Sequence, residues 1–208
     1  MPDPGSVTLP RPPWSLAPVD VRRDLEDGLE QTQALNRFLQ DVEKRAFRIA
    51  QIAVRDADEA LDLVQDAMLQ LARSYAARPS AEWAPLFYRI LNNRIRDWQR
   101  RRKVRSRVLA FWSGRDGEDE TDDAVSAAPD PGFGPSEQLE SEEALAVLSR
   151  ALEALPDTQR EAFLLRSFEG LDVAATATAM GCSTGSVKTH YFRAVQALRE
   201  ELGEAWGT

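Results

Sequence analysis

The stretch from Leu155 to Leu202, LPDTQREAFLLRSFEGLDVAATATAMGCSTGSVKTHYFRAVQALREEL, divides into three expected helices separated by two breaks. In the third helix, apolar residues recur at the spacing of a single helical face. They are Val187, Tyr191, Ala194, Val195, Leu198 and Leu202. The opposite side carries Ser186, Thr189, His190 and Arg193. Hydrogen-bonding side chains on an outward helix face are the groups that read base edges in the major groove of DNA.

The breaks in this stretch predict a helix-turn-helix unit. Asp172 and Ser183 are expected to cap the second and third helices, and Gly181 tolerates the left-handed conformation at the end of the second. Upstream, Thr158 to Glu161 has the S/T-x-x-E form of a capping box for a supporting helix. The spacing favours DNA binding, and a plain three-helix bundle whose exposed face has no function is the alternative.

Length and composition limit the classes of protein to which the chain can belong. Its 208 residues suffice for one or two domains. A single cysteine, Cys182, excludes an internal disulfide and is typical of a reducing compartment. No apolar run approaches the about 18 residues of a membrane span, and the first residues lack the pattern of a signal peptide. The sequence therefore predicts a cytoplasmic protein without membrane insertion.

The charges are distributed unevenly, although the net charge is −8. From Arg94 to Arg107 there are eight Lys or Arg residues and one acid, Asp97. From Asp116 to Ser149 there are eleven Asp or Glu residues and no base. Because charges are screened beyond about 10 Å at ordinary salt, a polyanion responds to the local patch rather than to the net charge. The basic segment is thus a second candidate surface for nucleic acid.

Apolar spacing predicts three helices before the end of that basic segment. They cover about 20 residues from Leu35 to Ala53, a segment near Glu59 to Arg73, and one from about Pro85 to Arg102, which follows a loop at 74–84. The last helix mixes its basic residues with rings and amides, namely Tyr88, Asn92, Asn93 and Trp98. Basic groups neutralise phosphates, and rings and amides can hold unstacked bases. An ordinary helix with a basic end favoured by its dipole is the alternative.

The chain is therefore expected to be all-α, with two small helical domains joined by a flexible acidic linker. Residues 1–30, rich in proline, form a disordered or partly helical extension. The first domain spans 31–107, the linker 108–143 and the helix-turn-helix domain 144–208. The roughly 35 linker residues average roughly 30 Å as a flexible coil and reach about 115 Å when fully extended.

Motifs in the first domain resemble the extracytoplasmic-function (ECF) group of bacterial RNA polymerase sigma factors. Residues 60–66, ALDLVQD, are similar to the family's A-x-D-L-V-Q-[DE] stretch. Residues 87–94, FYRILNNR, with Asp97 and the arginines that follow it, are similar to L-Y-x-I-x-x-N-x-x-x-D-x-x-R.

The second domain resembles the same family. Leu155, Pro156 and Arg160 fit L-P-x-x-x-R, and residues 185–199, GSVKTHYFRAVQALR, fit G-[TS]-V-K-[ST]-x-x-x-R-A-x-x-x-L-R. The resemblance covers roughly Arg37 to Leu202 apart from the linker, and the motifs occur in the family's order.

The resemblance implies a sigma factor, which binds core RNA polymerase, recognises the −35 and −10 promoter elements, and directs promoter melting and transcription initiation. The residues that match the polymerase-docking surface, which binds the clamp helices of the largest catalytic subunit, are Asp62, Gln65 and Asp66. Those that match the −10 surface are Asn93, Arg94, Arg96, Arg100 and Arg101, and Asn93 with the loop at 74–84 matches the pocket for a flipped base. Those that match the −35 surface are Ser186, Lys188, Thr189, His190 and Arg193.

Three positions depart from the family's pattern. Ala175 and Thr176 stand where an acidic residue and Ile are common, and His190 stands where a basic residue is common. We therefore do not transfer a promoter sequence to this chain. The resemblance implies that polymerase holds the acidic linker stretched, and an inert tether is the alternative. A further hypothesis is that the linker covers the basic segment in the free protein.

Two other classes of function remain at this stage. One is a helix-turn-helix transcriptional regulator that acts as a dimer without a sigma role. The other is an enzyme, which the sequence disfavours because it has one histidine, one cysteine and no Gly-rich phosphate loop. We accordingly predict no catalytic site, metal, cofactor or small-molecule substrate. The expected partners are core RNA polymerase and promoter DNA, and the resemblance allows an anti-sigma factor without identifying its binding residues.

Overall fold

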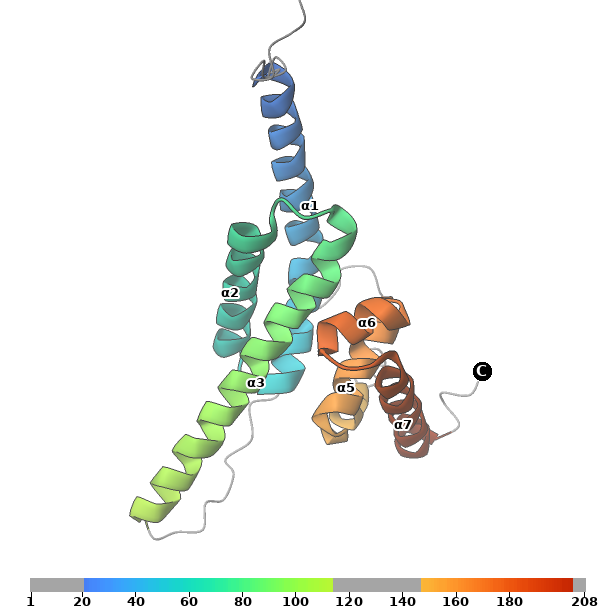
Figure 1. Ribbon diagram of the computed structural model, residues 1–208. Helices are drawn as coiled ribbons and strands as arrows, with labels where there is room; N and C mark the ends of the chain where they lie inside the picture. Colours follow the sequence, from blue (N-terminus) through green and yellow to red (C-terminus); the bar gives the residue numbers. More distant parts are fainter. Residues whose placement is uncertain (1–20, 114–146, 204–208) are drawn as a thin grey trace, which may run out of the picture.

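The computed structural model describes residues 21–113 and 147–203, and the regular structure in these two ranges is entirely helical (Figure 1). The predicted all-α class is therefore confirmed. Residues 1–20, most of the predicted linker and the last five residues lie outside the described ranges. The hypotheses about the acidic linker residues fall outside them as well. None of the described helices is both long enough and apolar enough to cross a membrane.

Three helices form the first domain: α1 (Val21–Val54), α2 (Ala57–Tyr75) and α3 (Ser80–Ser113). The chain reverses between α1 and α2 at Arg55, whose φ is 58°. The next residue, Asp56, then caps α2 by accepting a hydrogen bond from the Glu59 amide at 3.0 Å. The three helices pack against one another, and their apolar faces form one core. Fully buried members of that core include Val42, Val64, Leu71, Phe87, Tyr88 and Leu91.

The loop predicted at residues 74–84 is shorter than expected, because α2 runs to Tyr75 and α3 begins at Ser80. Only residues 76–79 connect the two helices. The sequence placed the start of α3 at Pro85, since proline usually stands in the first turn of a helix. Burial moves this start upstream: Trp83 is 2% exposed, and its ring lies 5.9 Å from that of Phe38 in α1. Tertiary packing thus outweighs local propensity.

The second domain consists of helical residues 147–154, α5 (Asp157–Phe163), the π-helical turn η1 (Leu164–Phe168), α6 (Val173–Met180) and α7 (Thr184–Leu202). The predicted helix-turn-helix unit is α6 and α7. Asp172 accepts a hydrogen bond from the Ala175 amide at 2.7 Å, and Ser183 accepts one from the Ser186 amide at 3.1 Å. Gly181 ends α6 with φ 67°. Both caps and the left-handed glycine are therefore confirmed.

The capping box predicted at Thr158 to Glu161 is wrong. The helix α5 begins at Asp157, directly after Pro156, and no side chain caps it. Glu161 instead binds Arg96 of α3, in the other domain. Glu161, which the local pattern assigned to capping the helix, thus forms a tertiary ion pair instead.

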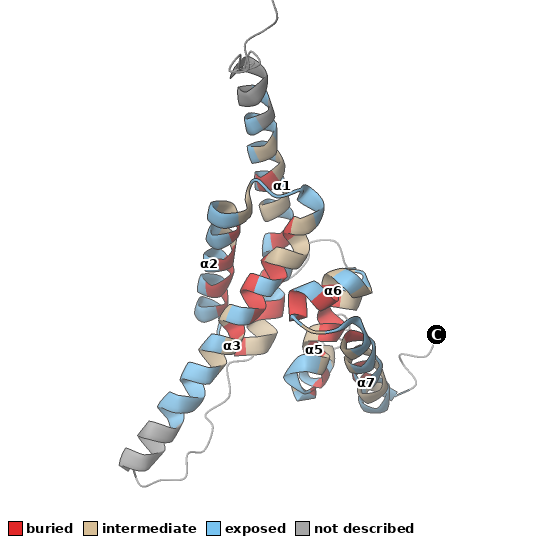
Figure 2. Ribbon diagram, in the orientation of Figure 1, coloured by how far each residue is buried: buried red, intermediate tan, exposed pale blue. Residues whose placement is uncertain are grey.

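The two domains are in contact. Figure 1 shows α6 lying beside α3, and Figure 2 shows buried residues on both helices where they meet. The end of α3 extends past this contact, and residues 100–106 are exposed. The inner face of α3 is thus shared between its own domain and the second domain.

Replacing Asp172 by Ala should lower the free energy of unfolding by about 1 kcal/mol, because the capping hydrogen bond to the Ala175 amide is lost. Asp172→Asn retains a capping side chain and is the matched control. Urea denaturation followed by circular dichroism measures both. Equal stability of the two variants would show that the cap contributes nothing.

Candidate nucleic-acid interface

One side of α7 is open to solvent, as the sequence predicted. Val187, Ala194 and Leu198 are buried, whereas Lys188, Thr189 and Arg193 are exposed. The Thr189 hydroxyl donates to the Gly185 carbonyl at 3.1 Å and keeps its acceptor capacity for an outside donor. Guanidinium, ammonium and hydroxyl groups are thus presented together on one helix face. These are groups that bind phosphates and guanine or adenine edges.

Two residues expected on this face are only partly accessible. The Ser186 hydroxyl lies 2.9 Å from that of Ser183, so it takes part in the cap of α7. His190 is half-buried, and its Nδ1 is buried without a hydrogen-bond partner among the described residues. The accessible face is therefore centred on the other three predicted residues, Lys188, Thr189 and Arg193. Whether Ser186 and His190 meet DNA stays a prediction.

Phe192 is a residue of this face that the sequence reasoning omitted. Its side chain is 63% exposed, between Lys188 and Thr189 in the helical projection. A large exposed aromatic ring among polar groups marks a contact surface, and Phe is one of the side chains that meet the methyl group of thymine. The signal was present in the sequence, because Phe192 falls outside the apolar stripe that buries Ala194 and Leu198.

The basic end of α3 presents two of the predicted arginines to solvent. Arg100 is exposed and lies 3.2 Å from Asp97, and Arg101 is exposed as well. Arg102 is exposed too, but its guanidinium already has partners within the protein: it lies 5.3 Å from the centre of the Trp98 ring and donates to the Val54 carbonyl at 3.3 Å. This end of α3 can therefore bind a phosphate backbone.

Two side chains that the sequence offered for holding bases are not accessible. Tyr88 is 0% exposed and Asn92 is 5% exposed, so both lie in the interior of the protein. That part of the prediction is wrong, and the reason is that α3 packs on two sides. Asn93 is exposed. It lies about 20 Å along α3 from the connection at 76–79, at 1.5 Å per residue, so the structure does not bring the two parts of the expected base pocket together.

The predicted polymerase-docking residues lie on one exposed face of α2. Asp62, Gln65 and Asp66 are all exposed. Two leucines that the sequence reasoning did not select, Leu61 and Leu69, are 39% and 52% exposed on the same helix. An apolar patch rimmed by carboxylates is typical of a protein-binding surface.

Arg94 connects this face of α2 to α3. Its guanidinium donates to Asp66 at 2.7 Å and to Gln70 at 3.1 Å. The two sets of residues predicted to bind polymerase and the −10 element therefore touch. Sequence spacing does not reveal this contact, because 28 residues separate Arg94 from Asp66.

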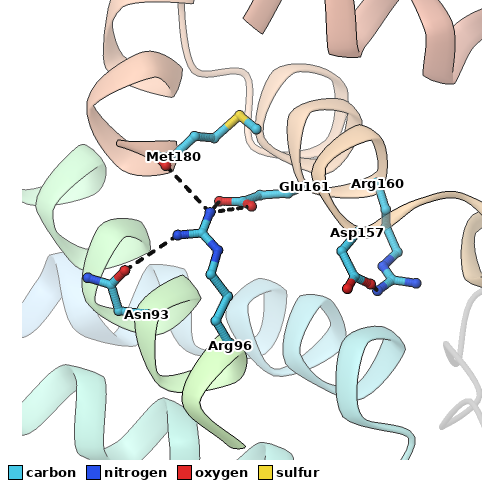
Figure 3. Close-up of polar contacts among 6 residues, drawn as sticks. All are labelled: Asn93, Arg96, Asp157, Arg160, Glu161 and Met180. Carbon is cyan, nitrogen blue, oxygen red and sulfur yellow. Dashed lines mark hydrogen bonds and ion pairs between the residues drawn. The ribbon is translucent and has the colours of Figure 1, made fainter. Parts of the chain in front are cut away.

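Arg96 connects α3 to the second domain (Figure 3). One terminal nitrogen of its guanidinium, Nη2, donates to both oxygens of Glu161, at 2.9 and 2.7 Å, and lies 3.4 Å from the Met180 carbonyl. The other, Nη1, lies 3.4 Å from Oδ1 of Asn93. Burial raises the pKa of the Glu161 carboxyl, and Arg96 opposes that shift. The structure thus brings Asn93 and Arg96 together, and covers Arg96 with the second domain.

The described residues contain no group of three or more His, Cys, Asp or Glu arranged to hold a metal ion. The candidate sites among the described residues are instead three exposed surfaces: the acidic and apolar face of α2, the basic end of α3 and the polar face of α7.

Two family models match the chain. Residues 35–105 match the family model "Sigma-70 region 2", and residues 145–198 match "Sigma-70, region 4". RNA polymerase sigma-H factor of Pseudomonas aeruginosa is 31% identical over 83% of this chain and 94% of its own length. RNA polymerase sigma-E factor of Streptomyces coelicolor is 30% identical over 75% of this chain and 78% of its own length.

Two further relatives match over a smaller part of their length. A probable RNA polymerase sigma factor, RfaY of Xanthomonas campestris, is 32% identical over 85% of this chain, which spans only 42% of that protein. The ECF RNA polymerase sigma factor SigD of Mycobacterium tuberculosis is 36% identical over 33% of this chain and 32% of its own length.

Solved structures share the fold. The sigma factor RpoE of Bartonella quintana, in complex with the anti-sigma factor NepR, has a TM-score of 0.58 at 24% identity and covers 80% of this chain and 95% of its own. CnrH, in complex with the cytosolic domain of CnrY, has a TM-score of 0.52 at 20% identity and covers 85% and 96%.

The assignment of buried and exposed sides on α7 predicts opposite results for two truncations. Leu198→Ala should lower the free energy of unfolding by 2–5 kcal/mol, on the order of the usual cost of a core cavity, because Leu198 is 1% exposed. Phe192→Ala should change it by no more than about 0.5 kcal/mol. Urea denaturation of both variants is the measurement. A large loss in the Phe192 variant would place this ring in the core and remove it from the candidate interface.

Proposed function

This chain belongs to the sigma-70 family and, within it, to the ECF group of sigma factors, and from that premise we propose how its residues bring core RNA polymerase to a promoter. The observation that carries the proposal is the presence of two separate DNA-compatible surfaces, the basic end of α3 and the polar face of α7, on two helical domains. Its action is binding rather than catalysis. The place of that action is the cytoplasm, where polymerase and chromosome meet.

The exposed face of α2 is the surface that docks on polymerase. Asp62 and Gln65 make no described side-chain hydrogen bond and are open to a partner. Asp66 is fixed by Arg94, which orients its carboxylate. Leu61 and Leu69 add apolar area that becomes buried on docking, and burial of apolar area supplies much of the affinity of such interfaces.

The −10 element is bound by α3. Arg100 and Arg101 are accessible and neutralise backbone phosphates, and Arg94 and Arg96 extend this basic track toward Asn93. Extruding a base costs a few kcal/mol, which binding of that base has to offset. The Asn93 amide offers both a donor and acceptors to a base edge. The Trp98 ring, 5.3 Å from the Arg102 guanidinium, adds a half-buried aromatic surface on another side of α3.

The −35 element is read by α7. Lys188, Thr189 and Arg193 carry the contacts, Phe192 packs against a thymine methyl group, and Ser186 and His190 lie at the margin. The cap at Ser183 places the N-terminal turn of α7 so that its amide dipoles also favour a phosphate. The sequence that this face selects differs from that of relatives where these side chains differ.

An anti-sigma factor is the third partner that we propose. The support is a likeness of fold: RpoE of Bartonella quintana was solved with an anti-sigma factor, and CnrH with the cytosolic domain of CnrY. A protein partner of this kind would control access to the α2 and α3 surfaces.

Arg193→Ala should reduce selective promoter use by about 5- to 150-fold, because one bidentate base contact contributes about 1–3 kcal/mol of discrimination. The assay is in vitro transcription of fragmented genomic DNA with sigma-free core polymerase, followed by start-site mapping. Arg199→Ala, an exposed arginine of the same helix, is the matched control. Polymerase affinity should stay unchanged in both variants. Loss of polymerase binding in the Arg193 variant would mean that Arg193 supports the fold rather than reads DNA.

Replacing both Asp62 and Gln65 by Ala should weaken binding to core polymerase at least about tenfold, a loss of about 1.4 kcal/mol. Replacing Gln40 and Asp41 by Ala removes the same two kinds of exposed side chain from α1 and serves as the control. Fluorescence titration of core polymerase measures both. An unchanged affinity in the α2 variant would remove the docking assignment.

A further inference from the structure

Among the described residues, three ion pairs join the two domains. In each, the cation belongs to the first domain and the carboxylate to the second. The pairs are Arg96–Glu161 at 2.7 Å, Arg45–Glu169 at 3.2 Å and Arg55–Glu153 at 3.3 Å. The acid is the less exposed partner every time: 12% against 37%, 2% against 49%, and 19% against 45%. The second domain thus inserts three carboxylates toward arginines of the first.

In the central pair, the hydrogen bonds to Glu161 use the donor capacity of one terminal nitrogen of Arg96, Nη2. Glu161 takes Nη2 with both oxygens, and the Met180 carbonyl faces the same nitrogen (Figure 3). That carbonyl lies at the C-terminus of α6, the end of a helix dipole that favours a cation. Asn93 faces Nη1. A phosphate cannot take Nη2 while Glu161 occupies it with both carboxylate oxygens.

Glu169 is a second carboxylate of the second domain that packs against the first domain. Its carboxylate, 2% exposed, binds Arg45 and lies beside the buried hydroxyl of Tyr88. Burial, and then the neighbouring carboxylate, raise the pKa of Tyr88 far above its ordinary value. A side chain placed this deeply requires the two domains to be in close contact.

Apolar residues complete the contact. Ile49 and Ile95 of the first domain line the same hollow as Leu164 and Leu165 of the second. All four are buried. The helix α6, whose side chains are mostly those of Ala and Thr, packs against α3, and its Ala179 and Met180 are buried. The contact therefore has an apolar centre and charged pairs around it, as specific interfaces do.

We propose that Glu161 acts in the free protein as an internal substitute for DNA phosphate on Arg96, so that the closed pair of domains withholds the α3 surface from DNA. This inference rests on the proposed function, because it assumes that Arg96 binds the −10 strand. A carboxylate and a phosphate oxygen satisfy a guanidinium in the same way, so they compete for it. Promoter elements nearly two turns apart, at about 34 Å per turn, also require the contacting domains to separate.

The variant Glu161→Gln keeps the shape of the side chain and removes its charge. In the full chain, without polymerase, it should raise the affinity for a short single-stranded DNA of mixed sequence at least about fivefold, because a larger fraction of the protein is open. The released Arg96 should also make the slope of log K against log salt steeper by about 0.7, the contribution of one additional phosphate contact. Fluorescence anisotropy over a series of potassium chloride concentrations measures both quantities.

Two comparisons assign these effects to Arg96. Glu43→Gln removes one exposed carboxylate from α1 and should change neither affinity nor slope. Adding Arg96→Gln to the Glu161 variant should abolish the gain in both. An equal gain in the Glu43 variant, or a gain that survives in the double variant, overturns the proposal, since it would reflect net charge alone.

A further variant changes the contact from the side of the first domain and leaves every residue of the second domain unchanged. Arg45→Gln removes a base, which on charge alone should weaken DNA binding. If the contact between the domains prevents DNA from binding to α3, weakening that contact should instead make this variant bind the same DNA more tightly. Weaker binding would contradict the proposal.

Domain separation is measured independently of DNA. Nitroxide labels on cysteines introduced at Gln40 and Glu200, both exposed, report the distance between domains when Cys182 is replaced by Ala. Glu161→Gln should lengthen and broaden the distribution. If the domains separate while DNA affinity stays unchanged, the contact does not block DNA, and the proposal fails. Transcription with core polymerase tests the sigma role separately, and the Glu161 variant should retain it in full.

Discussion

The guanidinium of Arg96 has to have an anionic partner, and the arrangement of the two domains depends on which partner that is. Here it is Glu161, which is mostly buried, so the pair has given up much of its hydration. Removing one member of such a pair leaves the other charge without its partner, whereas exchanging one anion for another does not. The pKa of Glu161 reflects the same two effects: burial disfavours the charged carboxylate and raises the pKa, and the attraction of Arg96 favours the charged form and opposes that shift. Water is therefore a poor replacement for Glu161 as the partner of Arg96, whereas a phosphate group can replace it.

Two neighbouring arginines of α3 are held in this way by different elements. Arg94 is bound by Asp66 of α2, and Arg96 by Glu161 of α5. A partner that takes Asp66 releases Arg94, and a partner that draws the second domain away releases Arg96. The surface proposed for the −10 element is thus linked on one side to the polymerase-docking face and on the other to the −35 domain. The basic end at Arg100 and Arg101 stays accessible throughout.

Local chemistry explains what the sequence predicted correctly. The caps at Asp172 and Ser183 and the left-handed Gly181 lie within three residues of the atoms they contact, so the sequence pattern contains the interaction. The exposed and buried sides of α7 follow from helical periodicity in the same way. The match to two sigma regions then removed the support for a dimeric regulator without a sigma role.

Tertiary contacts explain what the sequence could not predict. Glu161 fits a capping box locally, yet its partner lies 65 residues upstream. The start of α3 follows from the burial of Trp83 against Phe38, which outweighs the usual position of proline. Tyr88 and Asn92 looked available for bases because no pattern within α3 showed that a second domain covers that helix. Glu153, Glu161 and Glu169 recur every eight residues, a regularity that acquires meaning only beside the arginines of the other domain.

If the α3 surface exchanges Glu161 for the −10 strand, a photo-cross-linking amino acid placed at Asn93 reports the exchange most directly. In the free protein, we expect cross-links within the chain, to the region around Glu161 and Met180. In a complex with core polymerase and a promoter, we expect cross-links to the −10 strand and loss of the internal ones. Internal cross-links that persist in the promoter complex, or DNA cross-links of equal yield in the free protein, would contradict the exchange.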